Sequence, residues 1–205
     1  PYTSSSDLSN MPLNPEISRF IREHLDDNPD QLLWKKNEYP DDRVVLAVEQ
    51  IQARENIKEK LPSWYACRDI FYPSKLSTEQ CSSETTAPYK ARLTTGNSLC
   101  DLTGGLGVDT YFFSQQVDKV TYVERDKSYC EAARFNFLAL GATNIEVIHA
   151  DATTVASQVI ADTYYVDPAR RTTDNKRVFA LTDYAPNVLE IKETLLRQGQ
   201  RLIIK

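Results

Sequence analysis

Apolar residues in the first ninety positions recur with the spacing of a helix face. Ile17, Phe20, Ile21 and Leu25 follow one another at intervals of one to four residues, on one side of a helix that begins at Asn14-Pro15. Further helices are expected from Asn28-Pro29, over 42–61 and over 76–87. This part of the chain is therefore predicted to be helical.

Two features set the limits of the later helices. Pro62 is expected to end the third helix, because proline cannot continue a helix from within. Ser77 and Gln80 have the spacing of a capping box that would open the fourth. The aromatic-rich segment 62–73 is predicted to be a linker that packs between the two halves of the chain.

After Gly96 short apolar runs alternate with helical stretches. Strands are expected over 98–102, 119–123, 144–149, 163–166 and 201–204. Helices are expected over 108–116, 127–140, 153–159 and 184–196. This alternation predicts an α/β, Rossmann-like, doubly wound parallel sheet of order 3-2-1-4-5, with ligands at the carboxyl ends of its strands.

The change of pattern suggests three segments. Residues 1–13, polar and Ser-rich, would be a disordered tail, native or introduced by cloning. Residues 14–93 would form an N-terminal helical domain and 94–205 a Rossmann-like core. A sheet that ended with the strand at 201–204 would leave a long apolar edge, so we expect the native protein to continue beyond it.

Composition narrows the class of protein. The chain is 41% hydrophobic and 26% charged, without an apolar run long enough for a membrane helix or a secretory signal. Its four cysteines form no CxxC pair and only two histidines accompany them, so we expect reduced thiols in a cytoplasmic protein and no metal site. The formal net charge is −5, so neither half is a basic nucleic-acid clamp.

The most informative motif joins the first strand to its helix. Asp101 ends the strand, and Gly104, Gly105 and Gly107 form a turn that lets backbone approach a ligand closely. Thr110 replaces the third glycine of the dinucleotide fingerprint, which argues against NAD or FAD. A carboxylate before the glycines would repel a pyrophosphate but attract an ammonium or sulfonium group.

Further acids follow the next strands. Glu124 ends the second strand, where an acid can accept both ribose hydroxyls. Asp151 follows the third strand and can accept a hydrogen bond from an adenine amino group. Asp167 follows the fourth and is succeeded by Pro168 and Ala169. Structural alternatives remain, because Asp151 can simply cap a helix and Asp167-Pro168 can simply form a turn.

From about residue 96 to 205 the chain resembles the class I S-adenosylmethionine-dependent methyltransferases. The resemblance implies S-adenosylmethionine as the cofactor. The residues that it assigns to cofactor binding are Asp101, Thr103, Gly104, Gly105, Gly107, Asp109, Glu124, Arg125, Asp151 and Ala152.

The family's fourth motif, an Asp or Asn, two prolines and an aromatic residue, falls at Asp167-Pro168-Ala169-Arg170. The resemblance implies that Asp167, Pro168 and Ala169 are catalytic and orient a target amine. Ala169 and Arg170 depart from the motif. Arg170, Arg171, Lys176 and Arg177 stand out in an acidic chain and are expected to contact substrate phosphates, unless they form a solvated loop.

Segments 61–65 and 76–84 also make the chain similar to bacterial methyltransferases related to trimethylguanosine-synthase-type RNA enzymes, which carry a THUMP-like RNA-binding module. That similarity implies methylation of an exocyclic amine of a base in RNA, with RNA held partly by a C-terminal region. The alternatives are a methyltransferase acting on protein or a small molecule, and a non-catalytic cofactor-binding module of an RNA-binding protein.

Overall fold

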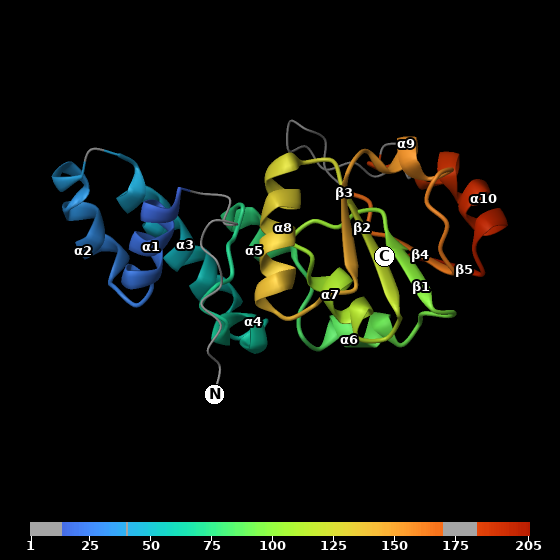
Figure 1. Ribbon diagram of the computed structural model, residues 1–205, viewed down its shortest axis with the longest axis horizontal. Coiled ribbons are helices and arrows are strands. Elements are labelled where there is room, and N and C mark those ends of the chain that lie inside the picture. The colour runs from blue at the N-terminus through green and yellow to red at the C-terminus, as the bar shows by residue number, and fades with distance from the viewer. Residues whose placement is uncertain (1–13, 40, 170–183) are drawn as a thin grey trace.

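The computed structural model describes residues 14–39, 41–169 and 184–205. Helices α1–α3 lie at one end of the molecule and a five-stranded sheet lies at the other, with α4 and α5 between them and α6 beside α7 at the sheet (Figure 1). Among the described residues, no helix has both the length and the apolar character that crossing a membrane would require.

The first helices begin where the sequence predicts. They are α1 (Pro15–His24), α2 (Pro29–Trp34), the 3₁₀ turn η2 (Lys36–Glu38) and α3 (Arg43–Ile57). The Asn14 side chain accepts the N–H of Glu16 at 2.8 Å, and Asn28 caps α2 in the same way. Helices α1 and α2 pack on α3 through one apolar cluster that includes Phe20, Leu32 and Val44.

Two predicted helices in the first half of the chain differ from those observed, and in the second half the helices predicted over 153–159 and 184–196 are observed over 152–155 and 188–198. Helix α3 ends at Ile57, and Pro62 opens α4 (Pro62–Ala66), because proline at the first helical position loses no hydrogen bond while it disfavours helical geometry at Leu61 before it. The predicted helix 76–87 is two helices, α5 (Lys75–Gln80) and α6 (Thr86–Ala91). Ser74, not Ser77, caps α5, by accepting the Ser77 N–H at 3.1 Å.

The second half is a parallel sheet of order β3-β2-β1-β4-β5, which confirms the predicted topology. Its strands are β1 (Ser98–Asp101), β2 (Lys119–Glu124), β3 (Ile145–His149), β4 (Thr163–Val166) and β5 (Arg201–Ile204). Its helices are α7 (Val108–Ser114), α8 (Lys127–Ala139), α9 (Ala152–Val155) and α10 (Val188–Gln198).

Alternate residues of the strands face two separate apolar layers. Val120 and Tyr165 pack on the face covered by α7, whereas Val123 and Tyr164 pack on the face covered by α9 and α10. This alternation follows from the two-residue repeat of a strand, and each tyrosine fills its layer with less than 2% exposure.

The layer that contains α7 extends into the first half of the chain. Trp64, Tyr72 and Ala87 are buried in the same cluster as Leu99 and Phe113, on the sheet side. The predicted domain boundary at residue 93 therefore crosses a shared core, and the division stays a prediction. Within this arrangement α6 packs on α7, and α5 lies beside the carboxyl ends of the strands.

Candidate functional site

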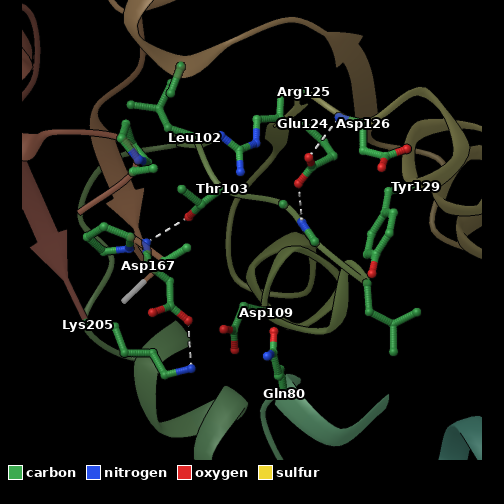
Figure 2. A pocket seen from close by; sticks show the side chains of 18 of the residues that line it. Gln80, Leu102, Thr103, Asp109, Glu124, Arg125, Asp126, Tyr129, Asp167 and Lys205 are labelled. Atoms are coloured by element: carbon green, nitrogen blue, oxygen red, sulfur yellow. Dashed lines mark hydrogen bonds and ion pairs between the residues drawn. The ribbon is translucent and has the colours of Figure 1, made fainter. Parts of the chain in front are cut away.

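The described residues form a cavity of about 830 Å³ at the carboxyl ends of the strands, with part of its wall supplied by α5 (Figure 2). Parallel pairing aligns the strand ends; for example, Glu124 lies beside His149 and Val166 beside Ile204. The predicted site residues that line the cavity are Thr103, Gly104, Gly105, Gly107, Asp109, Glu124, Arg125, Asp151, Ala152, Asp167, Pro168 and Ala169.

The glycine turn is shaped by an aromatic pair beneath it. A Cβ on Gly104 would lie 2.1 Å from the Tyr122 ring, and one on Gly107 would lie 2.8 Å from Phe137. Gly105, with φ of +53°, differs, because a Cβ there would meet only the Thr103 carbonyl at 3.9 Å. Gly104 and Gly107 therefore allow close packing below the turn, whereas Gly105 keeps its upper side open.

Replacing Gly104 by alanine is expected to lower the free energy of unfolding by about 1–3 kcal/mol, because the new methyl group overlaps a buried ring that cannot move freely. Gly141→Ala is the matched control. Gly141 has φ of +74° but nothing within 4 Å of its Cβ position, so only backbone strain of about 1 kcal/mol remains. Urea denaturation of both variants measures the difference, and equal losses would contradict the packing argument.

Glu124 holds the turn from the neighbouring strand. Its Oε2 accepts the N–H of Gly105 at 3.0 Å, and its Oε1 accepts the N–H of Asp126 at 2.9 Å. Figure 2 shows the carboxylate between these two backbone groups. A carboxylate has about four acceptor positions, so two are left for a ligand's hydroxyl groups.

Asp101 does not line the cavity, in contrast to the contact expected from the sequence. Its side chain is fully buried, accepts the Thr110 hydroxyl at 2.6 Å and accepts the Thr103 N–H at 3.0 Å. Burial raises the pKa of Asp101 to about 7, although both hydrogen bonds lower it. The structure thus gives Asp101 the role of fastening the glycine turn to α7 from below.

Asp151 caps a helix, as one of the two interpretations of the sequence predicts, and it also lies in the cavity wall. Its Oδ1 accepts the N–H of Thr153 at 2.8 Å and the Thr153 hydroxyl at 2.6 Å, which caps α9. These bonds lower the pKa of Asp151, so the carboxylate is ionised at neutral pH. It also lines the cavity beside Ala152.

Asp109 is held by groups from α6, from β4 and from the loop between α5 and α6. Its Oδ2 accepts hydrogen bonds from Ser82 at 2.9 Å, from Lys90 at 2.6 Å and from Tyr165 at 2.9 Å. Its Oδ1 is buried and has no hydrogen-bond partner among the described residues. A buried carboxylate oxygen without a donor is costly, and Oδ1 is the acceptor that the neighbours of Asp109 leave unused.

Asp167 is fixed by its backbone and its side chain. Its N–H donates to Thr103 Oγ1 at 2.7 Å, and its Oδ2 pairs with Lys205 Nζ at 2.7 Å. The backbone of Ala169 is engaged by Ala185, through bonds of 2.8 and 3.3 Å. Ala169 therefore anchors the turn, and Asp167 and the Pro168 carbonyl are the acceptors that this turn can present.

The predicted site residues and the residues that line the cavity differ in part. Arg170, Arg171, Lys176 and Arg177 lie outside the described residues. Cavity residues that the sequence reasoning missed include the segment 184–187 before α10 and, in or after α5, α8 and β5, the residues Ser77, Gln80, Cys81, Ser82, Tyr129 and Lys205. Of these, Lys205 could have been found, because it follows β5 as Asp167 follows β4.

Metal binding is not indicated in the part of the chain that the structure describes, which holds no group of three or more His, Cys, Asp or Glu side chains suited to an ion. The four cysteines are free thiols, and those of Cys100 and Cys130 are buried. Burial raises the pKa of the Cys130 thiol to about 11, which leaves it protonated at neutral pH.

Comparison with known proteins gives structural matches only; no family model and no curated sequence matches the chain. The structure of a candidate methyltransferase from Porphyromonas gingivalis W83 matches with 28% sequence identity and a TM-score of 0.76. The match covers 96% of this chain and 48% of the Porphyromonas chain. The chain thus spans about half the length of that protein.

Weaker matches cover less of the chain. An rRNA methylase from Streptococcus thermophilus has 16% identity and a TM-score of 0.44 over 58% of the chain and 69% of its own. A candidate methyltransferase from Streptococcus mutans in complex with SAH has 17% identity and a TM-score of 0.44, over 57% of this chain and 65% of the Streptococcus mutans chain. By its strand order and by the Porphyromonas match, the chain has the Rossmann-like fold of methyltransferases.

Proposed function

We propose that this chain binds S-adenosylmethionine and transfers its methyl group to an exocyclic amine of a base in RNA. The observation that carries the proposal is the meeting, in one cavity, of the glycine turn with Glu124, Asp151 and Asp167 from successive strand ends. The match to the Porphyromonas protein supports methyl transfer in general, and the identity of the acceptor rests on the residues around Asp167.

The residues present suit the cofactor. The open side of Gly105 leaves room for a ligand against the backbone, and the partnerless Oδ1 of Asp109 suits an ammonium group. Glu124 retains acceptor positions for ribose hydroxyls, and Asp151 presents an ionised carboxylate for an amino group. Asp101 acts beneath this surface and supports the turn rather than touching the ligand.

When bound, S-adenosylmethionine supplies an electrophilic methyl group on a sulfonium. The chain's own residues then orient the acceptor. Asp167 and the Pro168 carbonyl accept the two N–H groups of the amine, which directs the nitrogen lone pair at the methyl carbon. Positioning of this kind accounts for much of the rate acceleration in such reactions.

The proposed function has two alternatives, a different methyl acceptor and the absence of catalysis. Ala169 and Arg170 depart from the amine-transfer motif and the chain is acidic, which favours a protein or small-molecule acceptor. A non-catalytic cofactor-binding module would bind S-adenosylmethionine without turnover. We place the protein in the cytoplasm as part of the same proposal. Incubating the protein and methyl-labelled cofactor separately with cellular protein, RNA and metabolite fractions distinguishes these cases, because label enters only the fraction that contains the acceptor, and enters none if the chain is non-catalytic.

Calorimetric titration tests the cofactor first. We expect S-adenosylmethionine and its demethylated product to bind with a 1:1 stoichiometry and NAD to give no heat, because five acidic residues line the cavity where a pyrophosphate would have to sit. Binding of NAD alone would overturn the assignment. Incubation of methyl-labelled cofactor with total RNA from a strain lacking the protein then tests transfer.

Glu124→Gln should weaken the affinity for S-adenosylmethionine about 10- to 100-fold, because a charged acceptor of ribose hydroxyls is lost. Glutamine retains one acceptor oxygen for the turn, so folding is largely kept. Glu146→Gln serves as the control, since Glu146 pairs with Lys119 on the sheet and does not line the cavity. Calorimetry of both variants decides, and unchanged affinity in Glu124→Gln would remove this residue from the site.

A further inference from the structure

An ion pair that the sequence motifs do not predict lies in the part of the cavity where Asp167 is proposed to hold the methyl acceptor. Asp167 and Lys205 follow the paired strands β4 and β5, and the Lys205 N–H donates to the Val166 carbonyl at 3.0 Å. Lys205 Nζ and Asp167 Oδ2 lie 2.7 Å apart, and the side chains of Lys205 and Asp167 are 39% and 34% exposed. Both line the cavity, and Figure 2 shows the lysine reaching the carboxylate.

The pair has a defined hydrogen-bonding character. A carboxylate only accepts hydrogen bonds and an ammonium only donates them. Oδ1 of Asp167 has no hydrogen-bond partner among the described residues. The ammonium can donate three bonds, of which one goes to Asp167 Oδ2 at 2.7 Å and one to Ser82 Oγ at 3.5 Å. The pair therefore presents an acceptor, Asp167 Oδ1, directly beside a donor, Lys205 Nζ. A ligand that binds both must carry a hydrogen-bond donor beside a hydrogen-bond acceptor.

We propose that the methyl acceptor is a base that presents its exocyclic amine beside an unprotonated ring nitrogen, as adenine and cytosine do. This inference rests on the proposed function and deepens it. The amine donates to Asp167 while Lys205 donates to the ring nitrogen. Both nitrogens are attached to one carbon of the base, so a single edge can reach both members of a 2.7 Å pair.

The other bases fit this pair less well. Guanine has a protonated ring nitrogen beside its amine on the Watson–Crick edge, and this N–H would face the Lys205 ammonium, donor against donor. Its other neighbouring ring nitrogen lies on the edge that carries the ribose. Uracil has no exocyclic amine. A lysine or arginine side chain as acceptor would bring a second cation to Lys205, which like-charge repulsion disfavours.

Binding of nucleotides tests the inference without turnover. The protein is saturated with S-adenosylhomocysteine, so that the cofactor region is filled, and is then mixed with AMP, CMP, GMP or UMP in ligand-observed NMR. The four share ribose and phosphate and differ only in the base. We expect saturation transfer to AMP, CMP or both at several times the level seen with GMP and UMP. Equal signals from all four, or a preference for GMP, would overturn the inference.

Variants of Lys205 identify the residue responsible. Lys205→Met keeps the length of the side chain but removes the donor, and should lower the affinity for the preferred nucleotide about 10-fold while leaving S-adenosylhomocysteine binding unchanged. Lys205→Arg should restore part of the affinity. Lys119→Met, at an exposed lysine outside the cavity, is the control. Unchanged nucleotide binding in Lys205→Met would exclude the lysine from recognition.

Transfer to RNA gives a separate result. After incubation of total RNA with methyl-labelled cofactor and the protein, the digested nucleosides should carry label as N6-methyladenosine or N4-methylcytidine. Label in N2-methylguanosine would support RNA methylation and overturn the base assignment. Nucleotide preference for AMP or CMP without any transfer to RNA would retain the base assignment and refute the proposed RNA methylation.

Discussion

Replacing Asp167 by alanine is expected to lower the rate of methyl transfer about 10²- to 10³-fold, while the affinity for S-adenosylmethionine stays within about twofold. The carboxylate is the acceptor proposed to orient the amine, and its loss removes both the orientation and the partner of Lys205. The Asp167 N–H, which binds Thr103, is retained in the variant, so the turn below is preserved. Single-turnover kinetics and calorimetry measure the two quantities separately.

Asp167→Asn sharpens this prediction. An asparagine would turn its carbonyl oxygen toward the Lys205 ammonium 2.7 Å away and leave its NH₂ group facing the acceptor amine, donor against donor. We therefore expect the Asn variant to be nearly as slow as the Ala variant. Asp162→Asn, a change of the same kind in a carboxylate outside the cavity, controls for the substitution itself. Full activity in either Asp167 variant would exclude the amine-orienting role.

The sequence predicts the fold well because its signals are local and periodic. Apolar runs of four to six residues, separated from one another by helical stretches, define all five strands, and the glycines after Asp101 mark the first turn. The carboxyl ends of parallel strands meet at one edge of a sheet. For this reason Glu124, Asp151 and Asp167, which lie far apart in the sequence, could be assigned to one cavity.

What the sequence does not predict depends on packing between distant segments. The segment from α5 to α6 is held at the cavity by contacts of Ser82 and Lys90 with Asp109, and no periodic pattern encodes them. The burial of Asp101 likewise depends on Thr110 from α7 closing over it. A strand-end acid in sequence can face the cavity or lie beneath it, and the packing of the following helix decides which.

The buried position of Asp101 predicts a dependence of stability on pH. Its pKa is about 7 in the folded protein, against 3.8 for an exposed aspartate, because burial penalises the charged form. Between these two values the folded chain holds a proton that the unfolded chain has released. This contribution to stability is therefore complete below about pH 4, decreases as the pH rises, and is lost above about pH 7.

Asp101→Asn should remove this dependence, because asparagine resembles the protonated aspartic acid: its oxygen can accept the Thr103 N–H and its NH₂ can donate to the Thr110 hydroxyl. The free energies of unfolding of the two proteins should be close near pH 4 and diverge by up to about 4 kcal/mol, in favour of the variant, by pH 8. Urea denaturation at several pH values measures the divergence. Asp162→Asn should behave oppositely, since hydrogen bonds from the Asn97 and Ser98 N–H groups lower the pKa of Asp162, and its contribution is lost only in acid. A constant difference between wild type and Asp101→Asn across this range would show that Asp101 is charged in the folded protein, and its role beneath the glycine turn would then need a cation that the described residues do not supply.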